Sequence, residues 1–241
     1  MNTSDQEFSY DSIADAYAAQ VDESAYNALY ERPAMLGLLP PVDGKRILEA
    51  GCGAGWYTEQ LLARGARVTA LDGSAAMVEH ARRRIAALAP EVRERAEVRV
   101  ADLREPLEFA ADASYHGIVS ALVMHYMRDW GPALAEFRRV LAPGGWLLFS
   151  THHPAVDAAR LPEGGDYFEV VQEEDEWKRI GTVRFYRRPL TAIGDALAGA
   201  GFGIERIVEP RPGEVFRQAR PDAYAQLIRQ PEFILFLARP W

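Results

Sequence analysis

A short apolar strand that runs into a glycine-rich turn is the feature that most constrains this chain. The stretch reads Ile47-Leu48-Glu49-Ala50-Gly51-Cys52-Gly53-Ala54-Gly55, and a helical pattern begins at Trp56. Glycine at such a strand-to-helix turn permits positive φ angles and lets the backbone approach a ligand. The turn therefore predicts the nucleotide-binding corner of a doubly wound α/β sheet.

The residues around the turn indicate what kind of nucleotide it binds. A dinucleotide-binding turn has the pattern G-x-G-x-x-G, and Trp56 stands where its last glycine would be. An indole there opposes the close helix packing that seats a pyrophosphate on the helix terminus. Glu49, two residues before the first glycine, would repel a phosphate and suit a cation. We therefore expect a nucleoside that carries a positive charge and no phosphate.

Glu49, Gly51, Gly53 and Gly55 fit the pattern D/E-x-G-x-G-x-G, which resembles the first motif of class I S-adenosylmethionine (SAM)-dependent methyltransferases. A second acidic strand end and a Leu-x-Pro-Gly-Gly turn at residues 141–145 strengthen the resemblance. It implies SAM as the cofactor. It also implies a Rossmann-like, doubly wound seven-stranded sheet, mostly parallel, with an antiparallel last strand.

The composition favours one soluble α/β domain. We interpret the 241 residues as a single SAM-binding domain, with an N-terminal helical cap over residues 1–40 and an inserted β-hairpin over residues 151–189. The net charge of −8 disfavours nucleic acid or an anionic membrane as a partner. The single cysteine and the absence of a long apolar run favour a cytoplasmic protein, and a small molecule is the expected partner.

Asp72 ends the second predicted strand, about 20 residues beyond the glycines, where a carboxylate reaches both ribose hydroxyls. Its alternative role is to cap the next helix, which Ser74 would do equally well. The resemblance implies that Asp102 and Leu103 bind the adenine amino group and that Met77 lies on the adenine ring. The predicted cofactor-binding residues are Tyr17, Arg32, Glu49, Gly51, Gly53, Asp72, Gly73, Met77, Asp102, Leu103 and Ala121.

Two of these residues precede the first strand. In the family this leader folds over the cofactor, which implies that Tyr17 touches the methionine end; packing within the cap is the alternative. The guanidinium of Arg32 matches the methionine carboxylate, against the alternative of a solvated helix charge.

The reaction is less constrained than the cofactor. Methyl transfer needs alignment and exclusion of water, and an O or N nucleophile sometimes needs a base. The candidate bases are His125, His152 and His153, with no protein base as the alternative. His152 and His153 are adjacent on an extended segment, so at most one faces the substrate. We expect no metal site there, because adjacent histidines chelate poorly.

The leading function is transfer of a methyl group from SAM to an O, N or S nucleophile of a small molecule, because a cap and a hairpin would close the site. We expect that hairpin to pair residues 167–171 with residues 182–186, joined through the acidic run 173–176. Two alternatives stay open. One is a cyclase or lyase that acts on the aminobutyrate part of SAM and releases methylthioadenosine; the other is a non-catalytic SAM-binding protein.

Overall fold

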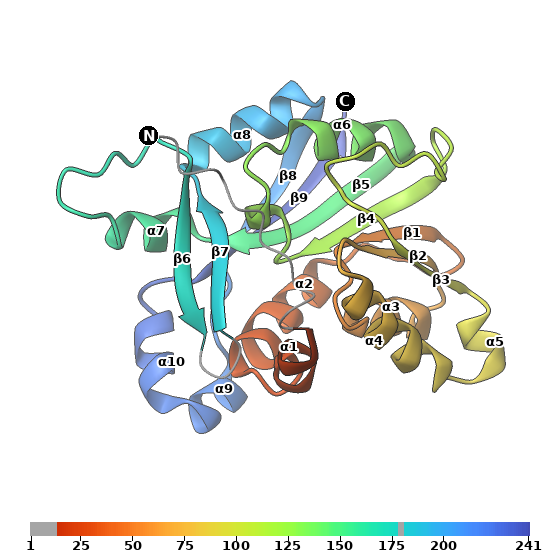
Figure 1. Cartoon of the computed structure of the whole chain (residues 1–241), viewed down its shortest axis with the longest axis horizontal. Coiled ribbons are helices and arrows are strands. Elements are labelled where there is room, and N and C mark those ends of the chain that lie inside the picture. Colours follow the sequence, from red (N-terminus) through yellow and green to blue (C-terminus); the bar gives the residue numbers. More distant parts are fainter. Residues whose placement is uncertain (1–13, 178–180) are drawn as a thin grey trace.

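A computed structural model describes residues 14–177 and 181–241 of the chain. Its centre is a seven-stranded sheet with the strand order β3-β2-β1-β4-β5-β9-β8 (Figure 1). Neighbouring strands from β3 to β5 are parallel, whereas β9 runs antiparallel to both β5 and β8. The predicted seven-stranded sheet with an antiparallel last strand is thus confirmed. The strands are β1 (Arg46–Ala50), β2 (Arg67–Asp72), β3 (Ala96–Val100), β4 (Tyr115–Ala121), β5 (Leu141–His152), β8 (Phe202–Val208) and β9 (Phe233–Pro240).

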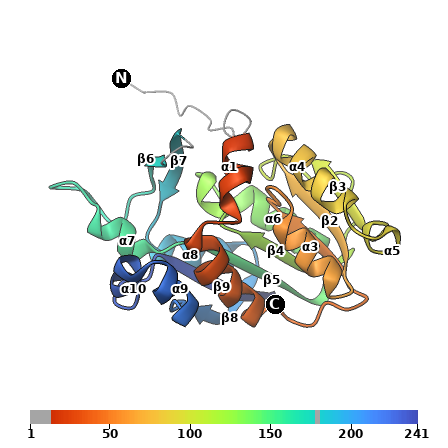
Figure 2. The ribbon, with the colours of Figure 1, turned by 90° about the horizontal axis from the view of Figure 1, so that it is seen from below.

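Helices cover both faces of this sheet. Helices α2 (Arg32–Leu38), α3 (Trp56–Ala63) and α4 (Ala75–Ala86) lie on one face, and α6 (Gly131–Val140) and α8 (Leu190–Gly199) lie on the other (Figures 1 and 2). The shorter helices are α1 (Ala14–Val21), the π-helix η2 (Asn27–Glu31), α5 (Pro90–Arg93), the 3₁₀-helix η3 (Met124–Tyr126), α7 (Pro154–Ala159), α9 (Glu214–Ala219) and α10 (Pro221–Leu227).

The apolar sequence pattern explains this layered arrangement. A parallel strand that is covered on both faces needs an almost continuous apolar run, and Ile47 and Leu48 of β1 are fully buried. In α6 the buried side chains follow helical spacing, with Leu134, Phe137 and Val140 facing the sheet. The carboxyl ends of the central strands therefore stand on a rigid core.

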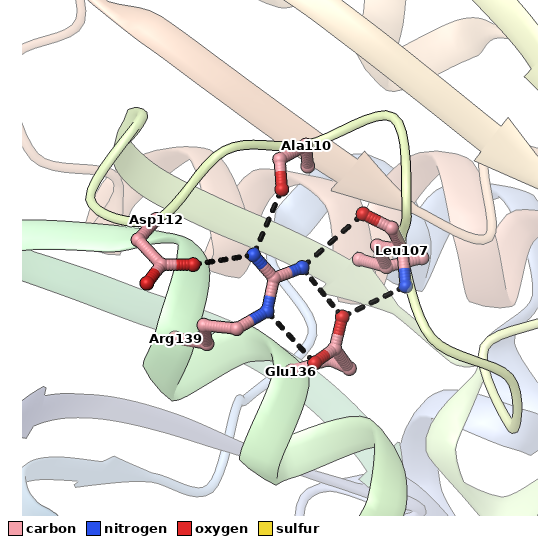
Figure 3. A network of polar contacts seen from close by, with 5 residues as sticks. All are labelled: Leu107, Ala110, Asp112, Glu136 and Arg139. Atoms are coloured by element: carbon pink, nitrogen blue, oxygen red, sulfur yellow. Dashed lines mark hydrogen bonds and ion pairs between the residues drawn. The ribbon is translucent and has the colours of Figure 1, made fainter.

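One polar network fixes the loop between β3 and β4 against α6 (Figure 3). The guanidinium of Arg139 donates to the carbonyls of Ala110 and Leu107 and to the carboxylates of Asp112 and Glu136, over 2.7–3.2 Å. Glu136 in turn accepts from the backbone N–H of Leu107 at 2.7 Å. These contacts satisfy loop carbonyls that no strand pairs, and they hold in place the segment that follows Asp102.

The inserted hairpin forms a separate two-stranded sheet of β6 (Val171–Trp177) and β7 (Gly181–Arg187). The expected boundaries were wrong, because the acidic run lies within β6 and residues 167–170 precede it. Opposite charges across the pair explain the difference: Glu174 accepts from Arg184 at 2.6 Å, and Glu173 accepts from Arg187 at 2.9 Å. The acidic run at residues 173–176, which the sequence predicted to be a turn, is therefore part of a strand whose carboxylates have charged partners.

In the helical cap that precedes β1, α1 packs against α4 and α2 packs against β5 (Figure 2). Within this cap the π-helical turn η2 leads directly into the regular helix α2. The side chain of Tyr17, a predicted cofactor-binding residue, lies outside the described part of the structure. Within the described part of the chain, no helix has both the length and the apolar character needed to span a bilayer.

Candidate active site

The glycine turn lies between β1 and α3 and leaves its backbone open to a ligand. Gly51 has a φ of +81°, and a Cβ atom there would lie 2.2 Å from a methyl group of Val123, so no side chain fits. Gly53 has a φ of +50°, and a Cβ atom there would meet nothing within 4 Å. The first glycine therefore allows close packing, and the second keeps open space beside the backbone.

Asp72 at the end of β2 joins the turn to the neighbouring loop. Its carboxylate accepts from the N–H of Gly53 at 2.8 Å and from the N–H of Ser74 at 2.9 Å. The cap of α4 is Ser74, whose hydroxyl accepts from the N–H of Met77 at 3.1 Å. The helix-cap alternative for Asp72 is therefore wrong, and its carboxylate lines a cavity instead.

That cavity has a volume of about 670 Å³ and extends from the glycine turn to the hairpin. We call it the main cavity. Eight of the eleven predicted cofactor-binding residues line it, namely Gly51, Gly53, Asp72, Gly73, Met77, Asp102, Leu103 and Ala121. Residues at the ends of four separate strands, or just after them, thus meet at one edge of the sheet, where open α/β sheets bind ligands.

Asp102 faces a cationic neighbour within this cavity. Both of its carboxylate oxygens accept from the Nε of Arg104, at 2.9 and 3.1 Å, and one accepts from Nη2 at 2.5 Å. The hydrogen bonds from Arg104 lower the pKa of Asp102 and so keep it ionised. An anion held in this way remains able to accept a further hydrogen bond from a ligand.

A smaller cavity of about 60 Å³ lies on the other side of the turn, and Gly51, Gly53, Ala121 and Leu122 line both cavities. Arg32 lines the smaller one, almost fully buried, with its guanidinium 4.2 Å from the centre of the Trp56 ring. It donates to Asp22 at 2.8 Å. The solvated-charge alternative for Arg32 is therefore wrong.

Glu49 lies beneath the turn and lines neither cavity. It is buried, and the hydroxyl of Thr58 donates to its carboxyl group at 2.5 Å. Burial raises the pKa of Glu49 to about 8, and the charge of Asp72 adds to the shift. At pH 7 the neutral carboxyl group therefore predominates in the ligand-free protein, so Glu49 contributes less negative charge than its type suggests.

The three histidines line neither of the two cavities. His125 and His152 stack with ring centres 3.9 Å apart, and Phe185 packs edge-on against His152 at 4.6 Å. Burial lowers the pKa of His152 to about 4 and that of His125 well below its ordinary value. His153 bonds Glu209 through Nε2 at 2.8 Å, and its Nδ1 accepts from the N–H of Ala155 at 3.0 Å. These rings are packed or hydrogen-bonded, and their role as bases stays a prediction.

The half of the main cavity away from the glycine turn is formed by η3, the loop after it, and the hairpin. Its wall carries Tyr126, Arg128, Gln172, Arg184 and Tyr186. The sequence suggested that a hairpin would close the site, but it gave no reason to select Arg128 or Gln172, whose positions depend on the fold. The described residues hold no group of three or more His, Cys, Asp or Glu side chains suited to a metal ion.

Leu122 follows β4 and lines both cavities in a strained backbone conformation. Its φ is +55°, a value that residues other than glycine rarely adopt. Its N–H donates to the hydroxyl of Ser150 at 3.0 Å. Strain of this kind persists where the surrounding structure fixes it, as it does at ligand sites. Nothing in the sequence pattern around Leu122 signals this conformation.

Comparison with known proteins agrees with this geometry. Residues 47–145 match the family model described as a methyltransferase domain. A SAM-dependent methyltransferase from Mesorhizobium loti superposes with a TM-score of 0.69 and 26% identity, over 91% of this chain and 99% of that one. Residues 47–145 of this chain are therefore a methyltransferase domain, and the fold is that of SAM-dependent methyltransferases.

Other proteins similar to this chain differ in length and name. A malonyl-[acyl-carrier protein] O-methyltransferase from Serratia marcescens is 37% identical over 141 residues, which are 58% of this chain and 49% of the relative. A protein of Haemophilus influenzae is 27% identical over 76% of this chain and 77% of its own length. The chain therefore spans about half the length of the named O-methyltransferase.

Proposed function

We propose that this protein transfers the methyl group of SAM to a nucleophile on a small molecule. The observation that carries the proposal is the main cavity, which joins the glycine turn to the hairpin in one space of about 670 Å³. A cavity of this size is typical of a small-molecule site. It has room for a nucleoside at one end and an acceptor at the other.

The residues present fit SAM. Open space beside Gly53 and the carboxylate of Asp72 suit a ribose with both hydroxyl groups free, and Asp102 suits an adenine amino group. Arg32, in the smaller cavity, suits the methionine carboxylate. When bound, SAM supplies an electrophilic methyl group on a sulfonium.

The protein's own contribution is to hold the acceptor in line and exclude water. Tyr126 and Tyr186 offer aromatic walls at the acceptor end, and the guanidinium groups of Arg128 and Arg184 offer positive charge. This combination favours a polar acceptor that carries an anionic group, such as a carboxylate. The relatives named as malonyl-[acyl-carrier protein] and ubiquinone biosynthesis O-methyltransferases favour oxygen as the nucleophile.

The proposal does not require a histidine base. A carboxylate acceptor is already ionised at neutral pH, so its oxygen can attack once it is aligned. This agrees with the position of the three candidate histidines outside the walls of the two cavities.

Incubation with SAM, first alone and then with a pool of small carboxylic acids, tests the proposed function. Mass spectrometry should detect no turnover with SAM alone, and S-adenosylhomocysteine together with a methyl ester once the acceptors are added. Methylthioadenosine formed from SAM alone would instead support the cyclase or lyase. Replacement of Arg184 by Gln should raise the KM for the acceptor while leaving the affinity for SAM unchanged, because Arg184 lies at the acceptor end.

A further inference from the structure

A buried carboxylate that the proposed function does not use stands at the smaller cavity. Glu31 ends the π-helix η2 and is only 1% exposed, yet its side chain lines that cavity. The hydroxyl of Ser150 donates to one carboxylate oxygen at 2.6 Å, and the hydroxyl of Tyr57 donates to the other at 2.8 Å. Each oxygen thus has one donor, and a carboxylate can accept more than two hydrogen bonds.

The local backbone indicates that this position serves a ligand. Single π-helical turns are rare, and they occur frequently at functional sites. Here the turn brings Glu31 and Arg32 together at the smaller cavity, where the regular helix α2 begins. Glu31 and Arg32 are adjacent, oppositely charged and both buried.

The hydrogen bonds of Glu31 also lead back to the strained residue between the two cavities. Ser150, which donates to Glu31, accepts from the N–H of Leu122. Leu122 lines both the main and the smaller cavity. A ligand group on Glu31 would therefore be held in a fixed position relative to the acceptor end.

The charges of the smaller cavity complement an α-amino acid. Its wall carries the carboxylates of Asp22 and Glu31 and the guanidinium of Arg32, with Trp56 and Tyr57 as aromatic neighbours. Asp22 is bonded to Arg32 and to Arg84, so it already has cationic partners. Within the described part of the chain, Glu31 accepts hydrogen bonds from two hydroxyl groups, which makes it the carboxyl group best suited to a ligand cation. Burial raises the pKa of Glu31, and a bound cation would favour its ionised form.

We propose that Glu31 binds the ammonium group of the aminobutyrate end of SAM, beside Arg32, which holds the carboxylate. This inference rests on the proposed function, because it assigns a residue to the cofactor of that function. It adds a recognition site for the amino acid part of the ligand, contributed by the segment that precedes β1.

Four thioether ligands separate the two charges in a binding test by calorimetry. S-adenosylhomocysteine carries both charged groups, its deamino analogue lacks the ammonium, its decarboxylated analogue lacks the carboxylate, and methylthioadenosine lacks both. Glu31→Gln should weaken the binding of S-adenosylhomocysteine and of the decarboxylated analogue about 10- to 100-fold, which is the range for a hydrogen bond between charged groups. The other two ligands should change less than about threefold, because they have no ammonium group to lose.

Arg32→Gln should give the complementary pattern: only S-adenosylhomocysteine and the deamino analogue should bind more weakly, because only these two ligands carry the carboxylate. Tyr57→Phe is the matched control, because it removes a hydroxyl donor to Glu31 and keeps the carboxylate. Its ratio of affinities for S-adenosylhomocysteine and methylthioadenosine should match the wild type. The wild-type protein should itself bind the deamino analogue about 10- to 100-fold more weakly than S-adenosylhomocysteine, a comparison that needs no folded variant.

Two results would overturn the role of Glu31 and leave the methyltransferase function standing. One is an equal loss of affinity for all four ligands in Glu31→Gln. The other is an equal affinity of the wild-type protein for S-adenosylhomocysteine and its deamino analogue. A wild-type protein that bound none of the four ligands would overturn both proposals.

Discussion

Replacement of Glu49 by Gln should make the ligand-free protein more stable at alkaline pH. Glu49 is 2% exposed beneath the glycine turn, and its carboxyl group accepts from the hydroxyl of Thr58. Burial raises its pKa from an ordinary 4.5 to about 8, opposed by the Thr58 hydrogen bond and reinforced by the charge of Asp72. The folded protein therefore binds this proton more tightly than the unfolded chain does.

The sign of the effect follows from that difference. Below pH 4.5 Glu49 is protonated in both the folded and the unfolded state, so it does not lower the free energy of unfolding. Between pH 4.5 and 8 only the folded state keeps the proton. Stability then falls by about 1.4 kcal/mol per pH unit, which gives about 5 kcal/mol over the whole interval. That is a large part of the ~5–15 kcal/mol by which a typical domain is stable.

Urea denaturation of the ligand-free protein at pH 5, 7 and 9 measures this effect. The wild type and Glu49→Gln should differ little at pH 5, and the variant should be more stable by several kcal/mol at pH 9. Glu79→Gln, at an exposed position of α4, is the matched control and should stay within about 0.5 kcal/mol of the wild type throughout. Parallel pH profiles of the wild type and Glu49→Gln would refute the reasoning.

Three further changes give distinct results. Asp72→Asn should weaken SAM binding by about 1–3 kcal/mol in calorimetry, because the charged acceptor for the ribose is lost; unchanged affinity would exclude that contact. Arg139→Gln should destabilise the protein by about 1–2 kcal/mol, and amide hydrogen exchange should accelerate in residues 101–114, whose carbonyls it binds; exchange confined to α6 would count against the network. His152→Phe should reduce the loss of stability between pH 6.5 and 4, because the folded state keeps this histidine neutral and the unfolded chain does not; an unchanged acid limb in urea titrations would contradict the low pKa.

The grouping of the proposed cofactor-binding residues around one cavity was predictable because these residues follow strand ends. In a parallel sheet the carboxyl ends of neighbouring strands meet at one edge, so residues far apart in sequence, such as Asp72 and Asp102, come together once the strands are recognised. The glycine pattern supplied the position of the first strand. Local signals and one topological rule were therefore sufficient for this half.

The acceptor half was less predictable because contacts between residues far apart in the sequence stabilise its helices and strands. The acidic run in β6 is stabilised as a strand by ion pairs with Arg184 and Arg187 of β7. Likewise α9 lies in an Arg- and Pro-rich stretch that gave no helical pattern, and its Phe216 is buried against Tyr26 and Tyr30 of the cap. Neither partnership is visible in a local sequence window.

The contrast between Glu49 and Glu31 shows where residue type alone misleads. Glu49 occupies the motif position, but it lies beneath the turn with a raised pKa and lines neither cavity. Glu31 belongs to no motif, yet the π-helical turn places it on the wall of the smaller cavity beside Arg32. The motif therefore shapes the turn, whereas the charge that complements an amino acid ligand comes from the segment before the first strand. Sequence motifs locate the nucleoside in a fold of this kind, and the elements that cover the sheet edge decide what else is bound.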